Sequence, residues 1–446
     1  MNEAVARPGK TDQHPTADTC RAERISAVTL SPTHPRWWYF AIAVALLLAL
    51  GYAAVILGLF SDGIGILGNN IPAAWGFPII NVAWWIDIGH GGLLIAAGSM
   101  LLRQRWQDVT RRIAENVALF AGAVGGSFAV LHTGRPQFAY FLYPYFNNLG
   151  LWPQWRSPLM WDFFGIIAFL GFALIFWYVS MLPDLALLRE RVTWYPGRWC
   201  YGVAALGWRN SLRQWTYYQT AMQILAVLAV LMAISTIGIS ALDFAGGIET
   251  GYHSTLMPVD AIAAALASAA GVILIFAILL RRMFNLHELV TTRHLNALAC
   301  LMLASITVNL LGYLYEIFMT WFTGNMFERE TMLEQLSGVF APLYWPMLVL
   351  HVGVPQALWW RRLRISPAAL VIIAILVNLG IWLDHYLTIV TYEAHGFMPS
   401  AWRMPLPTVW DWLTVVGSLG LFITLMFGSL RLLPVMVMFE LRKPAN

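Results

Sequence analysis

Charged residues are scarce in this sequence. Asp, Glu, Lys and Arg make up 11% of its 446 residues, whereas about a quarter is usual for a soluble protein. The hydrophobic residues, 59% of the chain, are gathered in long blocks. This pattern indicates a multi-pass membrane protein rather than a large soluble core. The formal net charge of +4 is small, so no nucleic-acid partner is expected.

Cysteine is nearly absent as well. The three cysteines, Cys20, Cys200 and Cys300, lie far apart and form no CxxC pair, which excludes a thiolate cage for zinc or an iron–sulfur cluster. No predicted span carries the paired histidines that a two-haem bundle would use. We therefore expect neither haem nor metal in this chain. P-loop, dinucleotide-binding and Ser-His-Asp patterns are also missing, which argues against a catalytic centre of the soluble type.

Long apolar stretches predict an all-α fold with ten transmembrane helices, each near the ~20 residues that cross a bilayer. Residues 1–36 are expected to form a flexible cytoplasmic tail without a signal peptide, 37–434 the membrane domain, and 435–446 a cytoplasmic C-terminal tail. The predicted spans are 38–59, 79–102, 113–132, 159–182, 214–238, 258–280, 295–322, 335–360, 366–389 and 410–433.

The distribution of Lys and Arg predicts the orientation of these spans. The two tails and every second connection together hold 23 of the 27 basic residues, and the connections on the other side hold four. By the positive-inside rule both termini face the cytoplasm, which requires an even number of spans. The expected location is the bacterial inner membrane.

An aromatic-rich loop joins the third and fourth predicted spans on the outer side. His132 ends the third span and Asp162 opens the fourth, so both are expected at one depth near the outer face. A neutral His and an ionised Asp are suitable acceptors for the two protons of a quinol. Arg135 or Arg156 would keep the aspartate ionised, and aromatic side chains such as Trp161 would hold the ring. The alternative is that these side chains are only interfacial anchors.

Six ionisable side chains are predicted inside the membrane, where a charge costs several kcal/mol and marks a functional candidate. Asp87 and His90 are three residues apart on the second span and share a helix face. The set would either relay protons along a hydrated path, which we favour, or tie helices together by hydrogen bonds. The other members are Glu316, His351, Asp384 and His385.

A short sequence similarity between two parts of the chain indicates an internal duplication. The sequence SPLMW opens the fourth span at Ser157, and APLYW lies near the start of the eighth at Ala341. We expect two four-helix bundles, formed by spans 2–5 and 6–9, with the first and last spans peripheral.

Several long motifs resemble a known family. The stretch 69–165, from NNIPAAWGFPIINVAWWIDIGHGG through LHTGRP to LWPQWRSPLMWD, resembles the NrfD/polysulfide-reductase-type membrane subunits. It is most similar to the quinol-binding integral membrane subunit of bacterial alternative complex III. The likeness continues through GYHSTLMP, EIFMTWFTGN, LVNLGIWLDHYLTIVT and FMPSAWRMPLPTVWDW.

The resemblance implies a function. A membrane subunit of this kind binds and oxidises quinol, either menaquinol or ubiquinol, near the periplasmic face, with proton translocation as a further expectation. His132 of the HTGRP motif and Asp162 of the RSPLMWD motif fall at the positions that line the family's quinol site. The implied partners are a periplasmic iron–sulfur subunit, multi-haem c-type cytochromes, a paralogous NrfD-like membrane subunit and a terminal oxidase.

Two other interpretations stay open. The chain could be the paralogous subunit, an anchor or proton-conducting module without a quinol of its own, which the buried carboxylates would also suit. It could instead be the quinone-linked anchor of a molybdenum reductase. In each case the chain is expected to act as a subunit of an oxidoreductase and not alone.

Overall fold

The computed structural model describes residues 17–31, 33–70, 73, 75–104, 106–142, 158–247, 255–394, 400 and 402–438. Within these ranges every regular element is helical and no strand occurs. Among the described residues, nine helices are long and apolar enough to cross a membrane. They are α2 (Arg36–Ser61), α3 (Phe77–Leu101), α4 (Gln107–Leu131), α5 (Pro158–Arg191), α7 (Leu212–Ala245), α8 (Met257–Met283), α9 (Thr292–Thr323), α13 (Pro367–Ala394) and α14 (Val409–Ser429).

Shorter helical elements connect or flank these nine. Helices fit a membrane because each satisfies its own backbone hydrogen bonds where water is absent. The short elements are α1 (Ala17–Leu30), η1 (Gly63–Ile66), η2 (Pro136–Leu142), α6 (Tyr195–Ala204), α10 (Met326–Leu336), α11 (Ala341–Leu348), η3 (Val349–Gly353), η4 (Val354–Trp359) and α12 (Arg361–Arg364).

The eighth predicted span is broken rather than continuous. Helix α10 and the segment Ala341–Trp359 meet at an angle of 78°, and the count of spans reaches the expected ten when this bent pair is taken as one. Proline explains part of the irregularity, because Pro346 and Pro355 each lack a backbone N–H donor. Between them the chain forms the π-helical turn η3. The expected continuous helix over 335–360 was therefore wrong in its first part.

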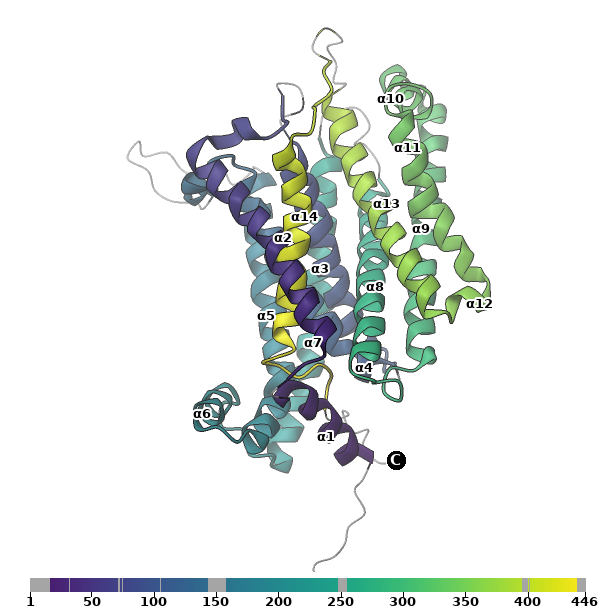
Figure 1. Ribbon diagram of the computed structural model, residues 1–446. Coiled ribbons are helices and arrows are strands. Elements are labelled where there is room, and N and C mark those ends of the chain that lie inside the picture. The colour runs from purple at the N-terminus through teal and green to yellow at the C-terminus, as the bar shows by residue number, and fades with distance from the viewer. Residues whose placement is uncertain are drawn as a thin grey trace, which may run out of the picture.

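The long helices form the two expected bundles (Figure 1). In the first, α3 contacts α4 and α7, while α5 closes the ring against both α4 and α7. In the second, α8 contacts α9 and α13, and the broken span completes the ring between them. Helices α2 and α14 run side by side outside the first bundle, against α3 and α4. The duplication expected from the sequence thus corresponds to two rings of four.

Small residues allow the two bundles to approach closely. At Gly91 of α3, a Cβ atom would lie 2.0 Å from the carbonyl oxygen of Ala265 on α8. At Gly89 and Gly92, a Cβ would meet the backbone of α4 at 2.9–3.0 Å. Close backbone contact through Gly and Ala is the usual way in which membrane helices associate, because lipid provides no hydrophobic drive between them.

A buried charge network closes the first bundle at the end where α1 lies. Arg112 pairs with Glu115 at 2.7 Å and with Asp184 of α5 at 2.8 Å. Arg111 pairs with the same glutamate at 3.4 Å, and Ser180 donates to it at 2.7 Å. Both arginines are at most 1% exposed. The sequence had placed them in a basic connection between spans, whereas they are internal to helix α4.

Both described ends of the chain meet at this end of the molecule (Figure 1). In place of an unstructured stretch, Ala17–Leu30 forms helix α1, and residues 1–16 lie outside the described ranges. Thr29 donates to the carbonyl of Leu433 at 3.2 Å. Met438, fully buried, donates its N–H to Asp184 at 3.2 Å. The sidedness of the termini in the membrane remains a prediction from the charge distribution.

The contact at Gly91 predicts a stability difference between two glycines of one helix. Gly91→Ala forces α3 and α8 apart and should reduce the free energy of unfolding by about 1–3 kcal/mol. At Gly98 a Cβ meets nothing within 4 Å, so Gly98→Ala should be neutral or slightly stabilising. Thermal unfolding in detergent measures both, and equal midpoints for the two variants would contradict the close packing.

The charge network predicts a larger effect. Arg112→Leu leaves Asp184 buried without its cation and Glu115 with Arg111 alone, and should cost about 3–5 kcal/mol. Arg361→Leu, at an exposed arginine of α12, should change the same unfolding midpoint little. A folded Arg112→Leu protein with the midpoint of the unsubstituted chain would show that the network does not stabilise the bundle.

Candidate functional site

His132 caps the end of α4 at the end of the bundle opposite α1. Its N–H continues the helix by bonding to the carbonyl of Phe128 at 2.9 Å. The chain then turns through Gly134, whose φ of 71° favours glycine, and enters η2 at Pro136. The imidazole is partly buried, and its Nδ1 atom is fully enclosed without a hydrogen-bond partner. A buried polar atom of this kind needs a partner to offset its lost hydration.

Asp162 lies in the second turn of α5, near enough to His132 for their charges to interact. Ser240 of α7 donates to Asp162 Oδ1 at 3.2 Å. Asp243, one turn further along α7, lies near enough to Asp162 for the two carboxyl groups to interact electrostatically. Three helices of the first bundle thus deliver an imidazole and two carboxyl groups to one place. Because two adjacent carboxylates repel, this arrangement favours a proton held between them.

Asp243 and Ser240 were missed by the sequence analysis. The predicted fifth span ended at residue 238, which left both in the following connection, whereas helix α7 continues to Ala245. An acidic residue in LDFAGG, directly after a long apolar segment, was the available signal. Its relation to Asp162 depends on the packing of α5 against α7.

The remaining residues predicted for this site are placed differently. Trp161 is 54% exposed and directly precedes Asp162 on α5. Arg135 is exposed, and its side chain lies beside Gly63 of η1. Within the described part of the chain it forms no ion pair with Asp162 or any other carboxylate. Arg156 and most of the aromatic loop lie outside the described residues.

A second polar constellation lies where the two bundles meet. Asp87 of α3 pairs with His385 Nε2 of α13 at 3.1 Å. The neighbouring Asp384 accepts a hydrogen bond of 2.6 Å from the hydroxyl of Tyr313 on α9. The same hydroxyl lies 3.0 Å from His351 Nδ1. Four of the six predicted intramembrane residues therefore lie in one region, with Tyr313 as a member that the sequence analysis did not single out.

The π-helical turn positions His351 in this constellation. A π turn inserts one residue and re-aims a side chain, and such turns often occur at functional sites. His351 packs against Gly380 of α13, where a Cβ would lie 2.4 Å from its backbone nitrogen. Its Nε2 atom is buried and has no hydrogen-bond partner. Neither the π turn nor the close contact between His351 and Gly380 can be predicted from a pattern in the sequence.

His90 lies apart from these groups. Its Nδ1 contacts the carbonyl of Ile86 at 2.8 Å, its Nε2 lies 2.6 Å from the hydroxyl of Thr236, and its ring stacks on Phe169 at 4.0 Å. Asp87 and His90 therefore belong to one helix but contact different neighbours, α13 and α7. Both ring nitrogens of His90 are satisfied, which is the arrangement of an inter-helix tie.

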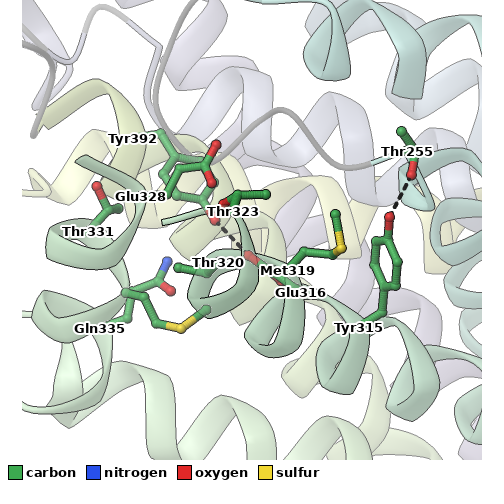
Figure 2. Close-up of a pocket in the computed structure, with 11 residues that line it drawn as sticks. Thr255, Tyr315, Glu316, Met319, Thr320, Thr323, Glu328, Thr331, Gln335 and Tyr392 are labelled. Atoms are coloured by element: carbon green, nitrogen blue, oxygen red, sulfur yellow. Dashed lines mark hydrogen bonds between the residues drawn. The ribbon is translucent and has the colours of Figure 1, made fainter. Parts of the chain in front are cut away.

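Glu316 lies beside a cavity of about 230 Å³ in the second bundle (Figure 2). Tyr392 donates to the Glu316 carboxylate at 3.3 Å. Gln335, 7% exposed, also borders the cavity. A space of this size with several polar side chains among its walls suits a few ordered waters. The residues that line it are Thr255, Tyr315, Glu316, Met319, Thr320, Thr323, Glu328, Thr331, Met332, Gln335 and Tyr392.

Metal ligands are not gathered anywhere in the described ranges. No group of three or more His, Cys, Asp and Glu side chains there is arranged to hold a metal ion. Cys200 and Cys300 are both free and exposed. The expected absence of haem and metal remains a prediction.

The fold and these sites define a multi-pass helical membrane protein with polar groups at one end and at the bundle interface. Residues 66–393 match the family described as polysulphide reductase, NrfD. The chain belongs to this NrfD family. The family assignment made from the sequence motifs is confirmed.

One curated relative adds a more specific likeness. A Halobacterium salinarum protein that carries the name of a dimethyl sulfoxide reductase membrane subunit is 28% identical over 272 residues. The match covers 60% of this chain and 56% of the relative. The chain therefore spans little more than half the length of that protein.

Proposed function

We propose that this chain binds quinol beside His132, Asp162 and Asp243 and oxidises it as the membrane subunit of an oxidoreductase complex. The observation that carries the proposal is the convergence of these three groups from α4, α5 and α7 at one end of the first bundle. A quinol releases two protons with its two electrons, so it needs two nearby acceptors. The unpartnered His132 Nδ1 is one available group.

The roles follow from the chemistry of the side chains. A neutral His132 accepts a hydrogen bond from one quinol hydroxyl and takes its proton. Asp162, fixed by Ser240, faces the other hydroxyl, and Asp243 receives the proton that Asp162 gains. Trp161 and Phe164 are exposed next to Asp162, and this apolar surface would admit a ring and isoprenoid tail from the lipid.

The electrons must leave through a partner. Because no metal-ligating group is gathered in the described residues, we propose that an iron–sulfur subunit docks over the outer loops. In the alternative complex III interpretation, multi-haem c-type cytochromes, a paralogous NrfD-like subunit and a terminal oxidase complete the assembly. Quinol oxidation then occurs at the periplasmic face of the bacterial inner membrane.

The relative's name favours a second candidate function, the quinone-linked anchor of a molybdenum-containing reductase. The same quinol site would serve both, so substitutions within it do not separate them. The composition of the complex does: c-type haem in the purified assembly supports the first candidate, and a molybdenum cofactor supports the second. A complex with neither would exclude both named assemblies.

We further propose that Tyr313 relays protons between His351 and Asp384. A phenol has a single proton, so Tyr313 donates to one neighbour while accepting from the other. Moving the proton from His351 through Tyr313 to Asp384 only exchanges these roles, with hydrogen bonds of 3.0 and 2.6 Å already in place. Glu316 and its cavity lie further along the same helix α9 and would connect this relay to water.

The quinol site predicts the behaviour of single variants. His132→Ala and Asp162→Asn should each lower quinol-dependent electron transfer by about a hundredfold or more, the usual contribution of a positioned acid–base group. The control is Asp62→Asn, an exposed aspartate at the same end of the bundle, which should retain full activity. The assay follows reduction of the complex's own electron acceptor by added quinol.

Assembly must be checked beside activity. Each variant should still be recovered with its partner subunits, because His132 and Asp162 lie at the rim of the bundle and not in its core. Full activity of both assembled variants would remove the proposed site and leave the anchor interpretation.

The relay predicts a separation of proton transfer from quinol binding. In proteoliposomes, Tyr313→Phe should reduce proton translocation about tenfold or more while the apparent affinity for quinol stays unchanged. Tyr217→Phe is the control, because this exposed tyrosine of α7 accepts a hydrogen bond from Arg213 at 3.1 Å and lies outside both the relay and the cavity. Unaltered proton movement in the Tyr313 variant would show that the phenol is only a structural link.

A further inference from the structure

Helix α6 is a lateral element that no proposed function uses. It lies beside the ends of α5 and α7 at the end of the molecule where the described termini meet (Figure 1). With 10 residues it is about 15 Å long, which is half of what a membrane span needs. Helix α6 is therefore too short to cross the membrane, and its position between two long spans has to serve another purpose.

One face of α6 is fixed to the rest of the protein. Tyr178 of α5 donates to the carbonyl of Ala204 at 2.6 Å. Tyr201 reaches across to the carbonyl of Leu432 near the C-terminus at 2.9 Å. Gly197 packs against Trp194, which would lie 2.6 Å from an added Cβ. These contacts hold the helix in one rotation about its axis.

The opposite face carries an apolar stripe that nothing in the described chain covers. Tyr195, Trp199 and Val203 follow one another at intervals of four residues, which places them on one side of the helix, and Leu206 lies in the turn directly after it. Their exposed fractions are 80, 63, 56 and 69%. An apolar stripe of this extent is unusual on a surface that faces only water.

Positive charge accompanies the stripe, and the nearest negative charge in the sequence, Glu190, is paired with Arg189 at 3.3 Å. Between Arg191 and Asp243 the sequence contains no Asp or Glu, but it contains Arg198, Arg209 and Arg213. All three arginines are exposed. Arg198 is on α6 itself, and Arg209 lies in the turn that follows it. The surface is therefore both apolar and cationic.

We propose that α6 lies in the plane of the membrane interface and binds the headgroups of anionic phospholipids. The stripe would enter the acyl boundary while arginine guanidinium groups contact lipid phosphates, as amphipathic interfacial helices do. Exposed apolar residues continue along α7 from Leu212 through Tyr217 to Ile224, so the stripe merges with the lipid-facing side of that span. This continuity favours lipid over a soluble partner.

The test measures which lipid lies next to α6. The full chain, with Cys20→Ser and Cys300→Ser and isolated with its natural partners, is labelled with a fluorophore at the exposed Cys200. It is placed in nanodiscs of one fixed phosphatidylcholine and phosphatidylglycerol mixture. Bromine, a quencher, is attached near the headgroup end of the acyl chains of one lipid or of the other.

Anionic binding predicts stronger quenching by brominated phosphatidylglycerol than by an equal fraction of brominated phosphatidylcholine. The expected enrichment is about fivefold for each arginine at the surface. It should fall by about fivefold or more in the double variant Arg198→Gln, Arg209→Gln, which keeps only Arg213, and remain unchanged in Arg361→Gln, an exposed arginine on α12. It should also fall as the salt concentration rises, which tests the unsubstituted protein without any variant.

Three results would overturn the proposal. Equal quenching by the two lipids would show that the helix contacts lipid without selecting charge. Absence of quenching by either would place α6 in water or under a protein partner. Enrichment that survives in the double variant and in high salt would assign the anionic lipid to another part of the chain. The measurement does not depend on quinol turnover, so it stands or falls separately from the proposed quinol site.

Discussion

The absence of water from the bilayer core is the constraint on which this structure depends. A polar side chain inside the membrane has to bond to its own helix or to a neighbouring one, because solvent cannot supply a partner. Asn81 of α3 illustrates the result: it donates to Thr414 of α14 at 2.9 Å and accepts from Trp382 of α13 at 3.0 Å. Asp87 and His385 join the two bundles in the same way. Polar residues therefore specify which helices are neighbours, while Gly and Ala set how closely they approach.

The two bundles use this constraint differently. The first has satisfied ionic groups at the end near the termini, where Arg112 holds Glu115 and Asp184, and incompletely satisfied groups at the other end, around His132 and Asp162. The second has a broken span, with the π turn at His351 and a cavity beside Glu316. Buried polar groups that lack a hydrogen-bond partner are costly. Such groups lie at the far end of the first bundle and beside the break in the second, so these are the two places where a ligand or water is expected to bind.

The duplication visible in the sequence is thus a duplication of architecture and not of chemistry. Trp161 and Trp345 end the two related motifs. The first motif leads into a continuous helix that carries Asp162, and the second follows a bend and leads to Pro346 and the π turn. The quinol site proposed above lies at the rim of one bundle, and the proposed proton relay lies beside the irregular span of the other. Both arrangements occur within one family fold.

The sequence alone determined the all-helical class, the number of spans and the family, because hydropathy and long motifs are properties of contiguous residues. His132 and Asp162 could be singled out because each stands at the edge of an apolar segment. The side chains that interact with these candidate residues could not be predicted from the sequence in this way. Asp243 meets Asp162, and Tyr313 joins Asp384 to His351, only through the rotation and packing of helices that lie far apart in the chain. The burial of Arg111 and Arg112 and the break between Leu336 and Ala341 were likewise decided by tertiary structure, because the free energy of a buried charge or a bent span depends on neighbours that no local pattern encodes.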